Sequence, residues 1–369
     1  MSSRLQDICL FNSSENVSTC VASGHEQLPD AMYAVLAVYL FSVTIFGILV
    51  NGAIIYLYFS RKEIATTSNM YVVALCICGF LIAILGVPFA AASSIRHEWL
   101  FGDGLCKVHG FLLTGLGIVM IAILTGIAID KYIFIVQYQS HHKVTRSVTL
   151  AIIIICFVYG VTWAILPLFG WNKYVLEPAR LTCSVEWTGD IGNHSYAITI
   201  LFTGLIIPVS IIAYLYTSIL KRVHSQRVIS QRIVSHSRKI KIIKREKRIA
   251  MTLFMMVASF VIAWLPYSVY GLICILGYSN DIPLIWHTIP SAFAKASILW
   301  NPMIYSSRSN AMKKALGETY PFLRWMIPRN KGQQKLPGQT TLIQMNTSNG
   351  SDAIFVQSLC DNRVISTSL

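Results

Sequence analysis

Seven long apolar runs constrain this chain more than any other feature of its sequence. Each run is near or above the roughly 20 residues that a helix needs to cross a bilayer. With 54% hydrophobic and only 12% charged residues, the chain is an integral membrane protein and not a soluble globular domain. We therefore predict an all-α fold, a seven-transmembrane helix bundle that forms one membrane domain over 33–307. The runs cover about residues 33–59, 70–94, 106–137, 149–171, 195–220, 249–276 and 283–307.

The positive charge predicts the orientation of the bundle. Between residues 221 and 248, after the fifth run, the chain places eleven Lys and Arg against one acid, Glu246. Such a loop belongs on the cytoplasmic side, which puts the N-terminus outside and the C-terminus inside. The net charge of +14 then needs no nucleic-acid partner, although anionic membrane lipid is a favourable one. Residues 1–30 have no basic region followed by an apolar core, so we expect the first span to direct insertion.

The two ends of the chain are polar by comparison. Residues 1–32 form an extracellular segment with glycosylation sequons at Asn12 and Asn16. Residues 308–325 alternate apolar and basic side chains, which predicts a short amphipathic helix on the inner leaflet. Residues 326–369 are rich in Ser, Thr, Asn, Gln and Gly and predict a disordered cytoplasmic tail. The apolar residues of the amphipathic segment are Met312, Ala315, Leu316 and Phe322.

Lys295 lies near the middle of the last apolar run. A lysine at mid-membrane costs about 2.5 to 3.5 kcal/mol, so it usually faces the bundle interior and has a partner or a task. More than two helical turns separate it from either interface, which is too far for its side chain to reach water. Two alternatives remain: a buried ion pair, or an amine that loses proton affinity on desolvation and condenses with an aldehyde.

Cysteines and charges mark the two ends of the bundle. Cys106 and Cys183 both fall on the oxidising outer side, where a disulfide between them would hold the loop after the fourth span over the bundle mouth. At the inner end of the third span stands Asp130-Lys131-Tyr132. This is either a solvated charge cluster or a latch, in which Lys131 pairs with Asp130 and across to Glu246.

With these motifs, residues 30–325 resemble the rhodopsin-like G-protein-coupled receptors, and within them the opsins. Lys295 stands six residues before Asn301, where opsins carry the lysine that binds retinal as a Schiff base. Segments around Trp163, Thr182 and Trp264 are similar to peropsin and neuropsin, a non-visual or invertebrate type. The resemblance rests on Asn51, Cys106 with Cys183, Asp130-Lys131-Tyr132, Pro208 with Tyr216, Trp264-Leu265-Pro266-Tyr267 and Asn301-Pro302-Met303-Ile304-Tyr305.

The resemblance implies a counterion for a protonated Schiff base, because a buried cation needs an anion. Glu177, six residues before Cys183, matches the counterion of many invertebrate and non-visual opsins. The alternative is a solvated loop carboxylate. His109, three residues after Cys106, stands where vertebrate visual pigments have a glutamate, and we expect it to be neutral or hydrogen-bonded near Glu177. The other pocket residues that the resemblance implies are Thr114, Gly117, Trp264, Tyr267, Ser268 and Ser291.

The resemblance also implies an activation switch and partners. The expected function is a light-sensing receptor in which isomerisation of 11-cis or all-trans-retinal activates a G protein, with arrestin and a receptor kinase as further partners. Its expected location is the plasma membrane or a photoreceptive membrane, and we predict no catalytic residues and no metal site. The switch residues are Asp130, Lys131, Tyr132, Tyr216, Glu246, Asn301, Pro302 and Tyr305.

Two alternatives to that function remain open. The first is a retinal photoisomerase with little or no signalling, which is favoured by two departures from the receptor pattern. Lys131 replaces the usual arginine, and Gly79 replaces an aspartate in the second span. The second is a receptor for a diffusible ligand, with Lys295 in a salt bridge, which retinal-dependent colour would exclude.

Overall fold

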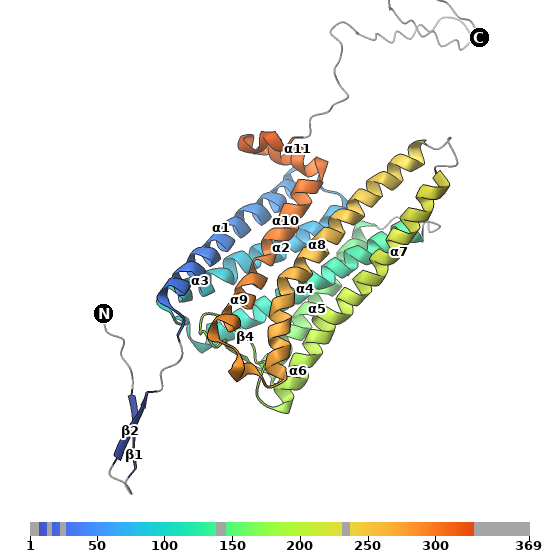
Figure 1. Cartoon of the computed structure of the whole chain (residues 1–369). Coiled ribbons are helices and arrows are strands. Elements are labelled where there is room, and N and C mark those ends of the chain that lie inside the picture. The colour runs from blue at the N-terminus through green and yellow to red at the C-terminus, as the bar shows by residue number, and fades with distance from the viewer. Residues whose placement is uncertain (1–6, 13–16, 23–26, 138–144, 231–236, 328–369) are drawn as a thin grey trace, which may run out of the picture. The chain divides into compact units, whose positions relative to one another are not determined.

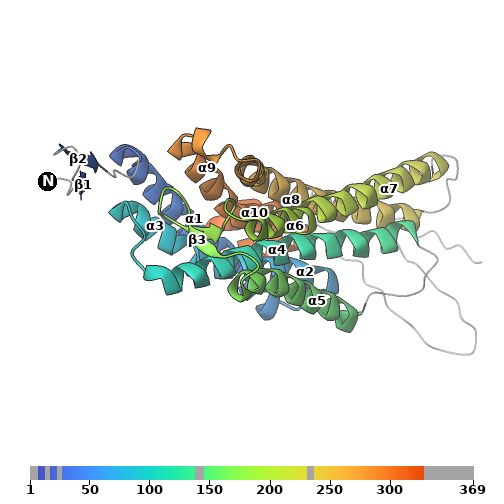
Figure 2. The same cartoon turned by 90° about the horizontal axis from the view of Figure 1, so that it is seen from below.

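The computed structural model of the chain describes residues 7–12, 17–22, 27–137, 145–230 and 237–327. Its main feature is a bundle of long helices, in which α4 contacts α2, α5, α7 and α8 (Figures 1 and 2). The helices that form the first six spans are α1 (Asp30–Ser60), α2 (Thr67–Leu85) with α3 (Val87–Arg96), α4 (Gly102–Val136), α5 (Arg146–Ile165) with the 3-10 turn η1 (Leu166–Phe169), α6 (Ile191–Leu201) with η2 (Phe202–Ile206) and α7 (Ile207–Ser230), and α8 (Ser237–Ile275).

The seventh span is divided into two helices. In the described part of the chain, six helical stretches are long and apolar enough to cross a membrane. The last span instead comprises α9 (Leu284–Lys295) and α10 (Ser297–Arg308), which meet at Ala296. Together they complete the predicted seven-helix bundle, so the predicted fold class is confirmed. The interruption falls directly after Lys295.

Helix-breaking residues explain two other irregularities. α2 ends before Gly86, and α3 begins with Pro88 in its first turn, because a proline offers no backbone donor. At the breaking point the Gly86 carbonyl accepts a hydrogen bond from His109 Nε2 at 3.3 Å. The π-helix η2 comes just before Pro208, and such insertions widen a helix locally. By contrast, α8 continues through Pro266 as one helix.

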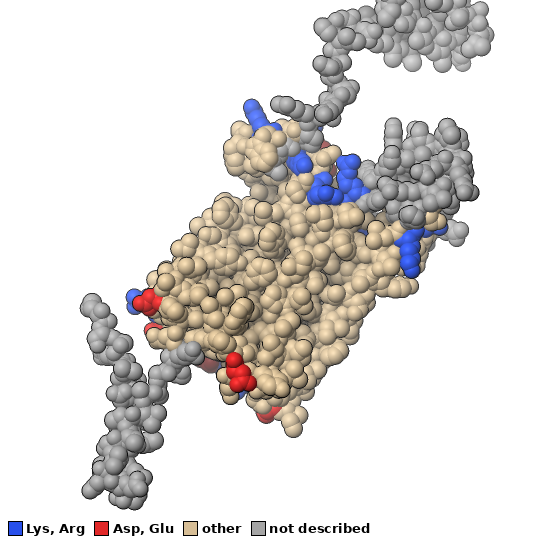
Figure 3. Space-filling view, viewed as in Figure 1, with Lys and Arg blue, Asp and Glu red and all other residues tan. Residues whose placement is uncertain are grey.

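Charged residues follow the predicted orientation. Lys and Arg side chains gather at the end of the bundle that carries the helix after α10, and Asp and Glu side chains lie at the opposite end (Figure 3). A basic cytoplasmic side is what the positive-inside rule requires of a multi-pass membrane protein. The chain accordingly places the start of α1 outside and the end of α10 inside.

Short strands occur only outside the spans in the described residues. β1 (Asp7–Asn12) pairs antiparallel with β2 (Val17–Ala22), in a register that sets Cys9 opposite Cys20. This N-terminal hairpin was not predicted from the sequence. β3 (Tyr174–Leu176) pairs with β4 (Cys183–Val185) in the loop after the fourth span. Asn12 ends β1, whereas Asn16 lies outside the described residues.

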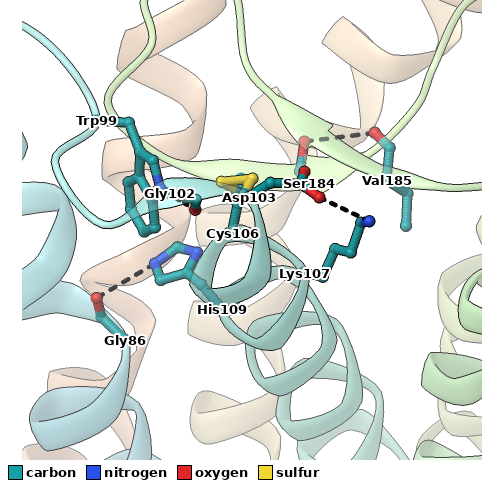
Figure 4. The surroundings of a disulfide bond; sticks show 10 residues. Gly86, Trp99, Gly102, Asp103, Cys106, Lys107, His109, Ser184 and Val185 are labelled. Carbon is teal, nitrogen blue, oxygen red and sulfur yellow. Dashed lines mark hydrogen bonds and ion pairs between the residues drawn. A yellow bond between two sulfur atoms is a disulfide. The ribbon is translucent and has the colours of Figure 1, made fainter.

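The β3–β4 hairpin is fixed to the outer ends of two helices. A disulfide joins Cys106 of α4 to Cys183 of β4, as predicted (Figure 4). Tyr174 of β3 donates its hydroxyl to the Ala164 carbonyl at 2.7 Å. Its ring also lies directly against Gly110, where an added Cβ would clash with the ring. The hairpin therefore has a fixed position over the outer end of the bundle.

Removing this disulfide is expected to destabilise the protein strongly. It joins residues 77 apart in sequence, and closing a loop of that length restricts the unfolded chain by about 4 kcal/mol. The double variant Cys106→Ser/Cys183→Ser should lower the thermal unfolding temperature of the purified protein in detergent. The buried free thiol Cys274 provides the control, as Cys274→Ala should have a much smaller effect. Equal losses in the two variants would contradict the prediction.

The helix that follows the seventh span differs from its predicted form. α11 covers Asn310–Thr319 and ends before a 3-10 segment, η4 (Pro321–Met326). Met312, Ala315 and Leu316, which were expected to face the membrane, are buried in the protein core. Of the predicted apolar face, only Phe322 is exposed, and it belongs to η4. The predicted tail begins at 326, and residues 328–369 lie outside the described ranges.

Candidate functional site

A cavity of about 140 Å³ lies inside the outer half of the bundle. It is far larger than the space that a single water needs, so it can hold an organic ligand. α2, α4, α6, η2, α8, α9, α10 and the β3–β4 hairpin all contribute to its wall. Most lining side chains are apolar, among them Leu113, Ile118, Leu205 and Phe260. Such a lining with a few polar groups is typical of a ligand site.

Lys295 brings an amine into this cavity. Its side chain is buried, at 9% exposure, at the C-terminal end of α9. Nζ donates a hydrogen bond to Ser291 Oγ at 2.7 Å, one helical turn earlier. In the described part of the chain, no acid lies within 4 Å of Nζ to form an ion pair. Among the described residues, the amine therefore has one hydrogen-bond partner, Ser291.

Glu177 lies at the same end of the cavity and is also buried, at 5% exposure. The structure thus excludes the alternative of a solvated loop carboxylate. The turn after β3 fixes the backbone of Glu177 by two hydrogen bonds. Glu177 donates its N–H to the Thr182 carbonyl at 2.9 Å, and Arg180 donates its N–H to the Glu177 carbonyl at 2.7 Å. Arg180 takes a positive φ of 55° to close this turn.

The Glu177 carboxylate is surrounded by hydrogen-bond donors. Tyr267 donates its hydroxyl to Glu177 Oε1 at 3.1 Å, and Trp187 Nε1 donates to the Tyr267 oxygen at 3.3 Å. Burial raises the pKa of the Glu177 carboxyl, while the charge on Lys295 and the nearby Tyr267, Ser291 and Ser184 side chains lower it. Ser291 thus stands beside both the amine and the carboxylate. Burial is the largest of these effects, so the pKa of the Glu177 carboxyl lies above its ordinary value.

Trp264 forms part of the inner wall of the cavity. Its ring fits against Gly117 of α4, where an added Cβ would stand 2.9 Å from Cη2 of the indole. Nε1 donates to Ser297 Oγ on α10 at 3.2 Å. The Phe260 ring stacks on the indole with centroids 5.7 Å apart. Trp264 is therefore in contact with the third, sixth and seventh spans at once.

The predicted pocket residues meet in this cavity with one exception. Thr114, Gly117, Trp264, Tyr267, Ser268 and Ser291 line it together with Lys295 and Glu177. His109 does not line it. The His109 ring instead packs between α3 and the loop after it, at 5.2 Å from the Trp99 ring, and bonds the Gly86 carbonyl (Figure 4). It has a structural role at the α2–α3 break.

The sequence analysis missed the apolar lining residues and, among the lining side chains that can donate a hydrogen bond, Ser184, Trp187 and Ser297. Ser184 and Trp187 come from the hairpin loop, and Ser297 follows the break in the seventh span. Once Cys183 is tied to α4, alternation along a strand would bring Val185 and Trp187 to the same side. That periodicity is the signal that could have identified Trp187. Ser297 had no comparable signal, because its position depends on the break at Ala296.

At the inner end, Lys131 is paired within α4 and with α2. Its Nζ lies 2.9 Å from Asp130 Oδ2 and donates to Ser68 Oγ at 3.1 Å, and both charged side chains are buried. The predicted contact with Glu246 stays a prediction, since the Glu246 side chain lies outside the described residues. Tyr132 is partly buried against the core beside this pair.

The remaining switch residues lie on α7 and α10. Tyr216 and Tyr305 are buried, and the Tyr216 hydroxyl has no partner among the described residues. Asn301 and Pro302 are buried in α10, and both polar atoms of the Asn301 side chain also lack a described partner. The Asn51 side chain fills the space beside Gly79, where an added Cβ would stand 2.9 Å from its Oδ1.

Comparisons with known proteins identify relatives of this chain. Residues 50–305 match the family model described as 7 transmembrane receptor (rhodopsin family). The chain is 29% identical to the G0-coupled rhodopsin of Mizuhopecten yessoensis, over 74% of this chain and 69% of that protein. It is 30% identical to the rhodopsin of Todarodes pacificus, over 81% and 68%.

Two further matches extend this result. The chain is 28% identical to Melanopsin-B of Xenopus laevis, over 82% of this chain and 58% of that protein. Among solved structures, the crystal structure of squid rhodopsin superposes with a TM-score of 0.77 at 29% identity. That superposition covers 83% of this chain and 90% of the squid chain. Both sequence and fold therefore relate the chain to the same group of proteins.

Proposed function

This chain belongs to the rhodopsin family of seven-transmembrane receptors as a light-sensing opsin, and we propose that it carries its retinal chromophore on Lys295. The observation that supports this most is the Lys295 amine, which opens into a large apolar cavity. An aldehyde with an apolar polyene fits both the lining and the amine. A desolvated amine is also the form that attacks a carbonyl carbon. When bound, retinal supplies light absorption and isomerisation.

We propose Glu177 as the counterion of the linked amine. It is the buried acid that lines the cavity beside Lys295, and Tyr267 holds its Oε1. Ser291, which accepts from Lys295, connects the two groups. A buried cation of this kind is stable only with an anion and satisfied hydrogen bonds around it. His109 takes no part in this proposal, because it lies outside the cavity lining.

We further propose that Trp264 passes a change in the cavity to the inner half of the bundle. It contacts Gly117 across the cavity wall and donates to Ser297 of α10. Two residues later Pro266 interrupts the hydrogen bonding of α8, which gives that helix a hinge. A displacement of the indole ring by the chromophore would therefore act on the sixth and seventh spans together.

A G protein is the partner that the family implies, and signalling is the favoured role. The relatives named G0-coupled and GQ-coupled rhodopsin, both of Mizuhopecten yessoensis, support signalling over isomerase activity. The retinal isomer, arrestin and the receptor kinase stay predictions. The tail to which the last two would bind lies outside the described residues.

Chemical trapping tests the attachment directly. The purified protein is incubated in the dark with 11-cis-retinal or all-trans-retinal, reduced with borohydride and digested. Reduction converts the C=N link into a stable secondary amine, so mass spectrometry locates it. We expect the retinyl group on the peptide that contains Lys295. The isomer that gives the higher yield of labelled peptide is the preferred form. A label confined to other lysines would overturn the proposal.

Replacing Gly117 is expected to damage the pigment through Trp264. In Gly117→Ala the new Cβ would lie 2.9 Å from the indole, and overpacking of this kind costs about 1 to 3 kcal/mol. We expect thermal loss of the visible band to be roughly tenfold faster. Gly204 is the matched control, because it lines the same cavity but has its nearest neighbours at 3.7 Å. Comparable decay rates in Gly117→Ala and Gly204→Ala would show that contact with Trp264 is unimportant.

A further inference from the structure

Trp187, in the loop that follows β4, has a fixed position at the outer end of the cavity. Its side chain is buried, at 9% exposure, in a hydrophobic cluster with Tyr174 and Tyr270. Asn172 fixes the adjoining backbone, since its side chain donates to the Glu186 carbonyl and accepts from the Glu186 N–H, both at 3.0 Å. The peptide group that joins Glu186 to Trp187 is therefore held in place.

A glycine on α8 makes room for the indole ring of Trp187. At Gly271 an added Cβ would stand 2.7 Å from Cζ3 and 2.8 Å from Cε3 of the indole. Even an alanine there would displace the ring, because a contact this short is overpacked. The Tyr267 ring, one turn earlier on α8, meets the indole edge to face with centroids 5.7 Å apart. The indole thus lies in a notch of α8 that depends on Gly271.

The indole N–H is part of a chain of hydrogen bonds that ends on Glu177. Nε1 of Trp187 donates to Tyr267 Oη at 3.3 Å, and the same hydroxyl donates to Glu177 Oε1 at 3.1 Å. A phenolic hydroxyl has one proton to donate, and that proton rotates to suit its neighbours. A donor that bonds the oxygen leaves the proton to face the carboxylate, and it also polarises the O–H bond.

The other groups around Glu177 do not replace this chain. The titratable groups that face it are Lys295 on α9 and Tyr267 and Tyr270 on α8. The hydroxyl of Tyr270 is bonded to His287 Nδ1 at 3.0 Å. Of the described side chains, Tyr267 is the one in direct hydrogen-bond contact with the carboxylate. The orientation of its hydroxyl therefore decides how well the anion is held.

We propose that Trp187 is a positioning residue for the Glu177 carboxylate, on which it acts through Tyr267. The inference rests on the proposed role of Glu177 as counterion and adds the loop residue that supports it. An aromatic ring without an N–H would also fill the Gly271 notch, so packing alone does not require an indole. Because a hydrogen bond to the charged form of an acid favours that form, weakening it should raise the pKa of the Glu177 carboxyl further.

Infrared spectroscopy of the full-length protein without retinal tests this role. The carbonyl stretch of the protonated Glu177 carboxyl is assigned from the difference between wild type and Glu177→Gln, and it is then followed through a pH titration. Trp187→Phe keeps an aromatic ring and removes the N–H, so we expect the midpoint of the titration to rise by about 0.5 pH unit.

Trp171→Phe is the matched control, because it makes the same chemical change at the same end of the bundle. The Trp171 indole donates to Ser195 Oγ at 2.9 Å and does not line the cavity. Its replacement should leave the midpoint unchanged. An unchanged midpoint in Trp187→Phe, or an equal rise in both variants, would overturn the proposal.

Two further variants separate positioning from packing. Gly271→Ala keeps the indole but displaces it, so the midpoint should also rise, whereas Gly104→Ala should have no effect because its added Cβ meets nothing within 4 Å. Tyr267→Phe should raise the midpoint by at least about one pH unit. Adding Trp187→Phe to Tyr267→Phe should then change nothing, since the path to the carboxylate is already broken. A further rise in that double variant would contradict the proposal.

The result is independent of the spectra that test retinal attachment, because the titration needs no chromophore. A raised midpoint in Trp187→Phe would support the positioning role even if the visible band did not depend on Glu177. A visible band that depends on Glu177, together with an unchanged midpoint in Trp187→Phe, would overturn this inference and leave the counterion proposal intact.

Discussion

Lys295→Ala is expected to abolish the visible absorption band that forms when the purified protein is regenerated with retinal. Its amine is the only one that opens into the cavity among the residues that the structure describes. Without it no covalent link can form, and unlinked retinal absorbs in the near ultraviolet. The measurement is a dark spectrum after incubation with 11-cis-retinal and, in parallel, with all-trans-retinal. We expect complete loss of the band with both isomers.

Two further variants separate this effect from a failure to fold. Lys295→Met keeps the length of the side chain and removes its charge, so it should be at least as stable as wild type. Like Lys295→Ala, it should form no visible band. Lys107→Ala removes an exposed lysine of α4 that pairs with Asp103 at 2.7 Å, and it should form the normal pigment. A visible band in Lys295→Met would end both the attachment proposal and its chemistry. If Lys295→Ala fails to fold but Lys295→Met folds, the spectrum of Lys295→Met alone decides the test.

The second large effect is expected from Glu177→Gln. Removing one partner of a buried charge pair costs about 3 to 5 kcal/mol, which lowers proton binding at the linked amine roughly a thousandfold. The pigment should therefore absorb in the ultraviolet at neutral pH and recover its visible band only in acid. A pH titration of the dark spectrum measures the shift. The glutamine keeps the size of the side chain and can still accept from Tyr267, so packing should change little.

Glu186→Gln is the matched control for the counterion. Glu186 belongs to the same loop, but its Oε1 is occupied by the Thr188 hydroxyl at 2.6 Å and it does not line the cavity. Its replacement should leave the visible band at neutral pH. If Glu186→Gln moved the band and Glu177→Gln did not, Glu177 would not be the counterion and the proposal would fail.

Much of the fold could be predicted from the sequence, because hydrophobic length alone determines which segments span a bilayer. The seven runs correspond to seven spans, and the basic residues between 221 and 248 predicted which side of the membrane is cytoplasmic. Lys295 stood out for the same reason, since a cation inside an apolar run has few possible roles. Glu177 could be proposed only from its spacing to Cys183, and its burial depends on how the β3–β4 hairpin folds over the bundle.

What could not be predicted depends on contacts between distant segments. His109 has the spacing of a pocket residue, but the break at Gly86 exposes a carbonyl that its ring satisfies instead. Lys131 carries its charge toward Ser68, a contact that a pattern within the third span cannot reveal. α11 has the periodicity of a membrane-surface helix, but its apolar face is covered by the protein, which periodicity alone does not distinguish from lipid.

The division of the seventh span at Ala296 gives this receptor a flexible point directly after Lys295, the residue that we propose carries the retinal. A continuous helix would respond to a pull on one side chain as a stiff rod, spreading the load over its whole length. Here Lys295 ends one segment and Ser297 begins the next. A sideways force on the Lys295 side chain therefore bends the chain at Ala296. The segment that moves is α10, which carries Asn301, Pro302 and Tyr305.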